Sequence, residues 1–171
     1  MPSEMFIKGF RYELSNRAFA LRVMQYLAKS SEGYEQFHLW SAYLALEQFN
    51  EPRYQMAAAY WGLDSPPSCW VAFKAWTVRL VPRTFHSALL KCVHAATVAY
   101  VDQLKVLRGE GPSAAHSFLS YMVAQEELQV EMMERAMAGR YLEIERLVAE
   151  FIIKSAVESP AISSLSPLQK A

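Results

Sequence analysis

The sequence predicts an all-α protein: a four-helix bundle built from two helical hairpins, with a long crossover between them and an extra C-terminal helix. Three observations lead to this prediction. Apolar residues recur with the period of an α-helix over long segments. Short turns, SSEG at 30–33 and GEGP at 109–112, punctuate each predicted hairpin. The segment 51–82 between the hairpins is long enough to cross the bundle from end to end.

The helical period and the breaker residues set the expected boundaries of each element. In chain order, the expected helices cover 10–29, 34–50, 53–63, 69–80, 83–108, 114–138 and 140–158. Residues 1–9 are expected to be a lead-in, and Gly139 interrupts the last two helices. One helical-bundle domain over 1–158 follows, with a Ser- and Pro-rich tail over 159–171 that lacks a helical period.

Composition narrows the classes of function. Apolar residues make up 53% of the 171 positions, which is typical of a chain with a substantial core. Lys plus Arg equals Asp plus Glu at 17 each, and this balance argues against binding nucleic acid. No apolar run approaches the roughly 18–20 residues of a membrane span, and no signal peptide or CxxC pair is recognisable. The sequence therefore predicts a cytoplasmic protein.

The predicted helix over 114–138 carries an acidic residue on its apolar face. Glu126 lies in the middle of the stripe, whereas Glu127 and Glu134 point away from it. A carboxylate removed from water needs a partner, because burial of an unpaired charge costs several kcal/mol or shifts the pKa of the group. Glu126 is therefore expected to bond a Tyr, Arg or His across the bundle, or else to hold a metal or act in catalysis.

The predicted helix over 34–50 repeats this pattern. Glu47 lies on its apolar stripe, and Asn50 follows three residues later, as Gln129 follows Glu126. The crossover would bring Glu47 and Glu126 towards one interior.

Folding each predicted hairpin about its turn extends this polar interior. Glu13 then lies opposite Asn50, while His94 lies within a turn of Glu126. Two groups of candidate residues follow. The candidate metal ligands are Glu13, Glu47, His94 and Glu126, and the expected buried polar cluster comprises Asn16, Asn50, Thr97 and Gln129.

The topology over residues 10–138 resembles that of the ferritin-like superfamily. Di-iron members of that superfamily place a Glu on each of two helices and a Glu-x-x-His on each of the other two. Glu47 and Glu126 match the glutamates of the latter motif, while Asn50 and Gln129 stand where histidines would be. The resemblance therefore implies a vestigial or altered metal site, with iron or manganese as the metals to consider.

Three functions follow from these observations. The first is a ferritin-like bundle whose metal site is lost or altered and which serves as a binding or structural module. The second is a metal-dependent oxidoreductase, with iron or manganese held by atypical carboxylate ligands. The third is a homo-oligomeric helical interaction protein, for instance a homodimer. The sequence identifies no catalytic residue and no small ligand, and it leaves open whether the chain is an enzyme.

Overall fold

The computed structural model describes residues 2–63 and 85–158, and within these ranges the protein is all-helical. The elements are α1 (Glu4–Ser30), α2 (Gln36–Tyr60), α4 (His86–Glu110), the short 3-10 helix η2 (Ser113–Ala115), α5 (His116–Met137) and α6 (Leu142–Glu158). The described ranges contain no strand, so the predicted all-α class is confirmed for them. No helix in these ranges is both long and apolar enough to cross a membrane.

Two boundaries differ from the sequence prediction. The first helix begins at Glu4 rather than at 10, because the hydroxyl of Ser3 caps it by accepting a hydrogen bond from the Phe6 amide at 3.1 Å. The helix α2 continues through Pro52 to Tyr60, so the piece expected over 53–63 is mostly the second half of α2. A proline inside a helix costs about 3 kcal/mol. Burial of Tyr54 and of other apolar side chains beyond the proline offsets this cost.

The turn between α5 and α6 forms where Gly139 was expected to interrupt the helix. Gly139 has φ +74, a conformation that favours glycine. Its amide donates to the Ala136 carbonyl at 3.0 Å, and the Arg140 amide donates to the Arg135 carbonyl at 2.9 Å. This pair of bonds is a Schellman motif, which satisfies the last carbonyls of α5 and turns the chain back along the bundle.

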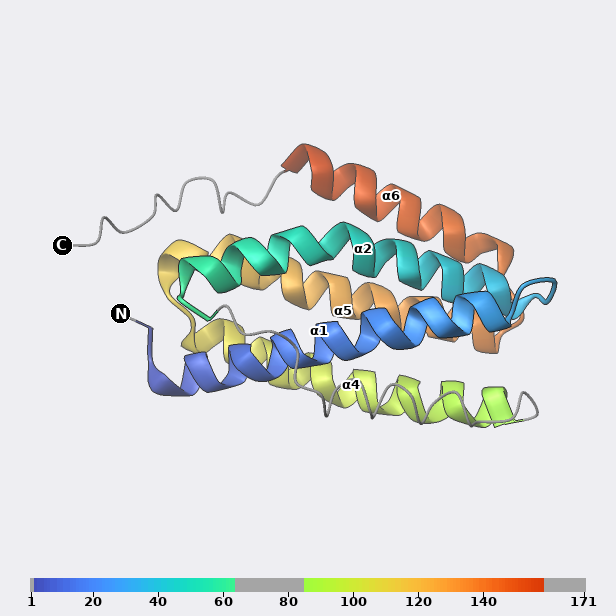
Figure 1. The fold of residues 1–171 in the computed structure, drawn as a ribbon, viewed down its shortest axis with the longest axis horizontal. Helices are drawn as coiled ribbons and strands as arrows, with labels where there is room; N and C mark the ends of the chain where they lie inside the picture. The colour runs from blue at the N-terminus through green and yellow to red at the C-terminus, as the bar shows by residue number, and fades with distance from the viewer. Residues whose placement is uncertain (1, 64–84, 159–171) are drawn as a thin grey trace.

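The helices form a bundle in which α1 packs against α2 and α4 packs against α5 (Figure 1). Further contacts of α1 with α4 and of α2 with α5 close the ring, and α6 lies outside it against α2 and α5. In Figure 1, α2 ends at the left of the bundle and α4 begins at the right. The helix expected over 69–80 and the tail over 159–171 lie outside the described residues.

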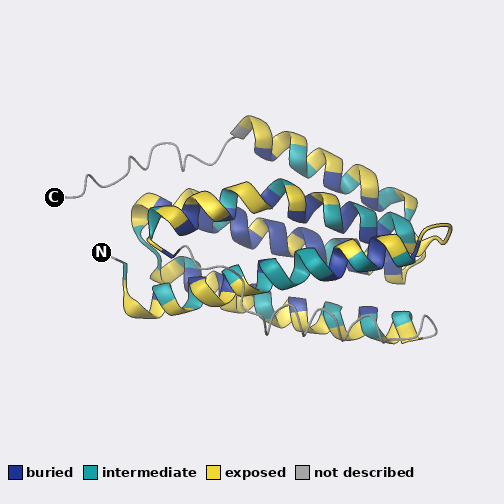
Figure 2. Ribbon diagram, in the orientation of Figure 1, coloured by how far each residue is buried: buried dark blue, intermediate teal, exposed yellow. Residues whose placement is uncertain are grey.

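The core consists of two apolar clusters, one towards each end of the bundle. The buried faces point to the interior, and α5 is the most enclosed helix (Figure 2). One cluster includes Val23, Leu27, Trp40, Leu46, Met132, Met133 and Ile144. The other includes Phe6, Phe10, Tyr54, Leu104, Phe118, Leu119 and Met122.

A layer of buried polar side chains lies between the two apolar clusters. Along α1 and α2, the polar positions fall between the positions that belong to one cluster and those that belong to the other. Along α5, Gln125 and Glu126 do the same, while Gln129 follows Leu128 of the first cluster. The members of the layer are Glu13, Arg17, Glu47, Asn50, Gln125, Glu126 and Gln129. The apolar clusters cover both ends of this layer, and their low polarity strengthens electrostatic interactions within it.

The turn that follows α4 offers a test of packing at the second apolar cluster. A Cβ added at Gly111 would collide with Leu119 Cδ1 and lie 3.2 Å from Phe6 Cε2, so Gly111→Ala overpacks the core. We expect a loss of about 1–3 kcal/mol in the free energy of unfolding, measured by urea denaturation. The matched control is Gly109→Ala within α4, where nothing lies within 4 Å and a gain of up to about 1 kcal/mol is expected. Equal effects of the two substitutions would contradict this account.

Candidate functional site

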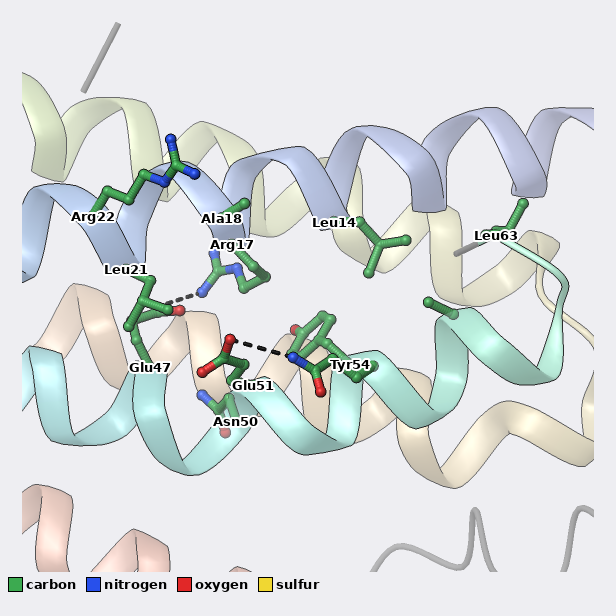
Figure 3. Close-up of a pocket in the computed structure, with 12 residues that line it drawn as sticks. Leu14, Arg17, Ala18, Leu21, Arg22, Glu47, Asn50, Glu51, Tyr54 and Leu63 are labelled. Carbon is green, nitrogen blue, oxygen red and sulfur yellow. Dashed lines mark hydrogen bonds and ion pairs between the residues drawn. The ribbon is translucent and has the colours of Figure 1, made fainter. Parts of the chain in front are cut away.

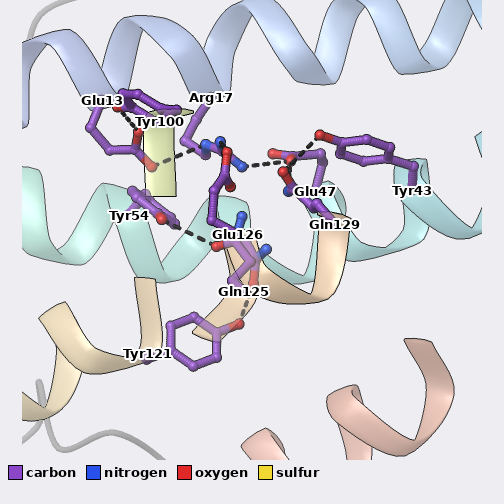
Figure 4. A network of polar contacts seen from close by, with 11 residues as sticks. Glu13, Arg17, Tyr43, Glu47, Tyr54, Tyr100, Tyr121, Gln125, Glu126 and Gln129 are labelled. Atoms are coloured by element: carbon purple, nitrogen blue, oxygen red, sulfur yellow. Dashed lines mark hydrogen bonds and ion pairs between the residues drawn. The ribbon is translucent and has the colours of Figure 1, made fainter. Parts of the chain in front are cut away.

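The polar layer is organised around one arginine (Figure 4). Arg17 is 9% exposed and points from α1 into the bundle, where its guanidinium contacts carboxylates from three helices. Its Nη1 donates to Glu47 Oε1 on α2 at 2.7 Å. Its Nη2 donates to both carboxylate oxygens of Glu126 on α5, at 2.8 and 3.0 Å. Its Nε lies 3.1 Å from Oε1 of Glu13, one turn earlier on α1, which is an ion-pair distance without hydrogen-bond alignment.

Neutral side chains from the neighbouring helices hold these carboxylates in place. The Tyr100 hydroxyl, on α4, donates to Glu13 Oε2 at 2.5 Å. The Gln129 amide donates to Glu47 Oε1 at 2.9 Å, and the Tyr43 hydroxyl donates to Gln129 Oε1 at 2.7 Å. All four helices of the ring therefore contribute to one connected network.

Two further tyrosines extend the network towards the second apolar cluster. Tyr54 donates to Gln125 Oε1 at 3.1 Å, and Tyr121 donates to Asn50 Oδ1. The amide nitrogens of Asn50 and Gln125 are buried and have no hydrogen-bond partner among the described residues. Each leaves a donor that water or a ligand would satisfy.

The cluster holds an excess of acidic groups. Glu13, Glu47 and Glu126 are 0%, 2% and 4% exposed, and together they face the single guanidinium of Arg17. Burial is the largest effect on Glu126 and raises its pKa to about 8, although Arg17 acts in the opposite direction. Burial likewise raises the pKa of Glu47 above its ordinary value, again against the effect of Arg17. A proton or a further cation would therefore stabilise this interior.

The carboxylates do not present a free metal site. Arg17 approaches all three at 2.7–3.1 Å and so occupies the space between them that a metal ion would need. Among the described residues, no group of three or more His, Cys, Asp and Glu side chains is arranged to hold a metal ion. With Arg17 in this position, the residues present do not fit iron or manganese, which need several free oxygen or nitrogen donors.

The structure brings together three members of the metal set. Glu13, Glu47 and Glu126 meet at Arg17, as the sequence predicted for Glu47 and Glu126. His94 does not join them, which corrects the expectation that it would lie beside Glu126. It is partly exposed, and its Nε2 lies 3.5 Å from Glu134 Oε1. The predicted hairpin register was therefore wrong at this position, because Glu134 lies two turns further along α5.

Two of the four residues of the predicted polar cluster belong to the network, and the other two lie beside it. Asn50 and Gln129 are buried within it. Thr97 is buried too, but its hydroxyl donates to the Val93 carbonyl in its own helix at 2.9 Å. Asn16 is only partly buried and lies beside Tyr100.

Arg17 is the central residue that sequence reasoning missed. The signal was present, since Phe6, Phe10, Glu13, Arg17, Met24 and Leu27 follow one another at spacings of three, four or seven residues. A helix that starts at 10 leaves Phe6 out of this stripe, so the stripe on which Arg17 lies is shorter and harder to recognise. The general expectation of a Tyr, Arg or His partner for Glu126 is confirmed, and the partner is an arginine.

Comparison with protein-family models, with curated proteins and with solved structures gives no match. The site is therefore argued from the residues of this chain alone.

Two cavities reach the cluster from opposite sides of α1. One lies between α1 and α2, has a volume of about 330 Å³, and reaches Arg17 and Glu47. The other lies between α1 and α4, has a volume of about 490 Å³, and reaches Arg17 and Glu126. Both volumes are within the range of small-ligand sites.

Removal of the central cation is expected to destabilise the protein severely. Arg17→Met leaves three buried carboxylates without a counter-charge, and we expect a loss of about 3–5 kcal/mol in the free energy of unfolding. Arg11→Met, at an exposed position of the same helix, should change it by no more than about 0.5 kcal/mol. Adding Glu126→Gln to Arg17→Met removes one stranded charge and should restore part of the loss. Equal stability of both single variants, measured by urea denaturation, would contradict a central role for Arg17.

The raised pKa of Glu126 predicts how stability depends on pH. The folded value of about 8 lies above the ordinary value of 4.5, so the folded protein keeps a proton that the unfolded chain releases between these values. Stability should therefore be greatest at the acidic end of this window and fall towards pH 8, by at most about 1.4 kcal/mol per pH unit for this one group. Glu126→Gln should flatten the profile, measured by denaturation between pH 5 and 8. The exposed control Glu127→Gln should retain the wild-type slope.

Proposed function

We propose that this chain is a ferritin-like helical bundle in which an ion-pair cluster replaces the interior metal site, and that it works as a binding module without a metal. The observation that carries this proposal is the position of Arg17, within 2.7–3.1 Å of three buried carboxylates. An arginine supplies the positive charge that a metal would otherwise supply, and its pKa is raised further by the surrounding carboxylates. The cluster therefore already holds a cation in the place that a metal ion would take.

The amide side chains support the same proposal. In the ferritin-like comparison, Asn50 and Gln129 stand at the positions of histidine ligands. Gln129 instead donates to Glu47 and accepts from Tyr43, while Asn50 accepts from Tyr121. These side chains act as hydrogen-bonding links between helices, and amides are poor ligands for iron.

The alternative of a metal-dependent oxidoreductase has less support. It requires Glu13, Glu47, His94 and Glu126 around one ion. His94 lies against Glu134, outside the cluster, and Arg17 separates the three carboxylates. A catalytic role would also need a group free to exchange protons or bind substrate, and each carboxylate here already has a partner in Arg17.

The cavities favour a binding role over a purely structural one. A bundle that needed only rigidity could fill the space on both sides of α1 with apolar side chains. Here, two cavities of about 330 and 490 Å³ end on buried polar groups. Cavities with apolar walls and a few polar groups are typical of small-molecule sites.

Metal content is the direct test of this proposal. The protein should be produced in medium supplemented with iron and manganese and analysed by inductively coupled plasma mass spectrometry. We expect far less than one metal ion per chain, and the same low value for the double variant Glu47→Gln/Glu126→Gln. One iron or manganese ion per wild-type chain, lost in the double variant, would overturn the proposal and favour the oxidoreductase.

A further inference from the structure

The cavity between α1 and α2 has features of a specific small-molecule site (Figure 3). We propose that it binds a small organic amine that also carries a hydroxyl or carbonyl oxygen, such as an amino alcohol with a short branched alkyl group. This inference deepens the proposed binding function and rests on it. Three features of the cavity lead to the ligand class: an unsatisfied donor, an excess of negative charge and apolar walls.

The unsatisfied donor is the amide nitrogen of Asn50. This residue is 1% exposed and lines the cavity, and its Oδ1 is already used by the Tyr121 hydroxyl. Its Nδ2 has no partner among the described residues. A buried N–H group without an acceptor costs about 1–3 kcal/mol. A ligand oxygen placed against Asn50 would remove that cost, which explains the requirement for a hydroxyl or carbonyl group.

The negative charge comes from the floor and the mouth of the cavity. Glu47 is at the floor beside Asn50, as Figure 3 shows, and Glu51 is at the exposed mouth, where it accepts a hydrogen bond from Gln55 at 3.3 Å. Both described hydrogen bonds of Glu47 end on Oε1, from Arg17 and from Gln129.

The charges around the cavity favour a cationic ligand. In the lining, Glu47 and Glu51 are balanced by Arg17 and Arg22. The guanidinium of Arg17 is shared, however, with the carboxylates of Glu13 and Glu126, which lie behind it. The local balance stays negative even when Glu126 holds a proton. An ammonium group beside Glu47 would complete the charge balance of the cluster, whereas a carboxylate ligand would worsen it.

The walls and the size of the cavity limit the rest of the ligand. Apolar side chains from both helices form the walls. They are Leu14, Ala18 and Leu21 on α1, Ala58 on α2, and Leu63 just beyond α2. A volume of about 330 Å³ is at the lower end of the range for ligand sites, so only a small alkyl group fits beside the two polar groups.

L-Leucinol is a suitable probe, because it has an ammonium group, a hydroxyl group and an isobutyl group. Two matched molecules lack one group each: isoamylamine has no hydroxyl, and 4-methyl-1-pentanol has no ammonium. Dissociation constants would be measured by titration calorimetry on the full chain after treatment with a chelator. We expect leucinol to bind at least tenfold more tightly than either analogue. Equal affinity of isoamylamine would overturn the role of Asn50, and equal affinity of 4-methyl-1-pentanol would overturn the role of the carboxylates.

A cavity-filling variant tests the location of the site. Ala18→Leu places a larger side chain into the cavity from a partly exposed position of α1 and keeps every residue of the ion-pair cluster. It should weaken leucinol binding at least tenfold, while Ala124→Leu on the exposed side of α5 should leave it unchanged. Leucinol binding that survives Ala18→Leu would place the ligand elsewhere and overturn the proposal. Should that variant fail to fold, Leu21→Trp fills the same cavity and serves the same purpose.

The leucinol titration and the metal measurement test the two proposals separately. A chain with stoichiometric metal and no leucinol binding would overturn both proposals. A metal-free chain that does not bind leucinol would overturn only the ligand class argued here.

Discussion

One buried guanidinium, shared by three buried carboxylates, is the constraint on which the arrangement of this bundle depends. Burial of four charged side chains has a large desolvation free energy. Their mutual attraction offsets it only if the charges meet at close range and in good alignment. The observed contacts meet that condition for Glu47 and Glu126, which receive hydrogen bonds of 2.7–3.0 Å from Arg17. Because these residues come from α1, α2 and α5, the ion pairs can form only when all three helices have one relative register.

The position of the cluster along the bundle reinforces this effect. Apolar clusters lie on both sides of it, one with Leu27 and Trp40 and the other with Phe10 and Phe118. Apolar side chains alone would tolerate a shift of one helix by a turn, since Leu and Met pack in many ways. A shift of about 5.4 Å would separate Arg17 from its partners and strand three charges in a dry interior. The polar layer therefore favours one alignment of the helices over the alternatives, as buried polar groups do in some coiled coils.

The same cluster explains why the interior can be receptive to a ligand. One arginine does not neutralise three carboxylates. Burial disfavours the charged form of Glu126 and raises its pKa to about 8. The remaining negative charge lies at the inner end of two cavities, one on each side of α1. A bound cation would relieve a charge imbalance that the fold itself creates, so the binding that we propose would also raise stability.

The sequence by itself determined the helical class, the turns at 30–33 and 109–112, and the inward direction of Glu47 and Glu126. Periodicity is sufficient for these features, since it fixes the direction of a side chain relative to the axis of its own helix. Only the tertiary structure decided which groups meet. It placed Arg17 between the carboxylates and His94 beside Glu134, and it showed Asn50 and Gln129 as hydrogen-bonding partners of Tyr121 and Glu47. These pairings depend on the relative register of neighbouring helices, which the packing of the whole core sets and which no single helix encodes.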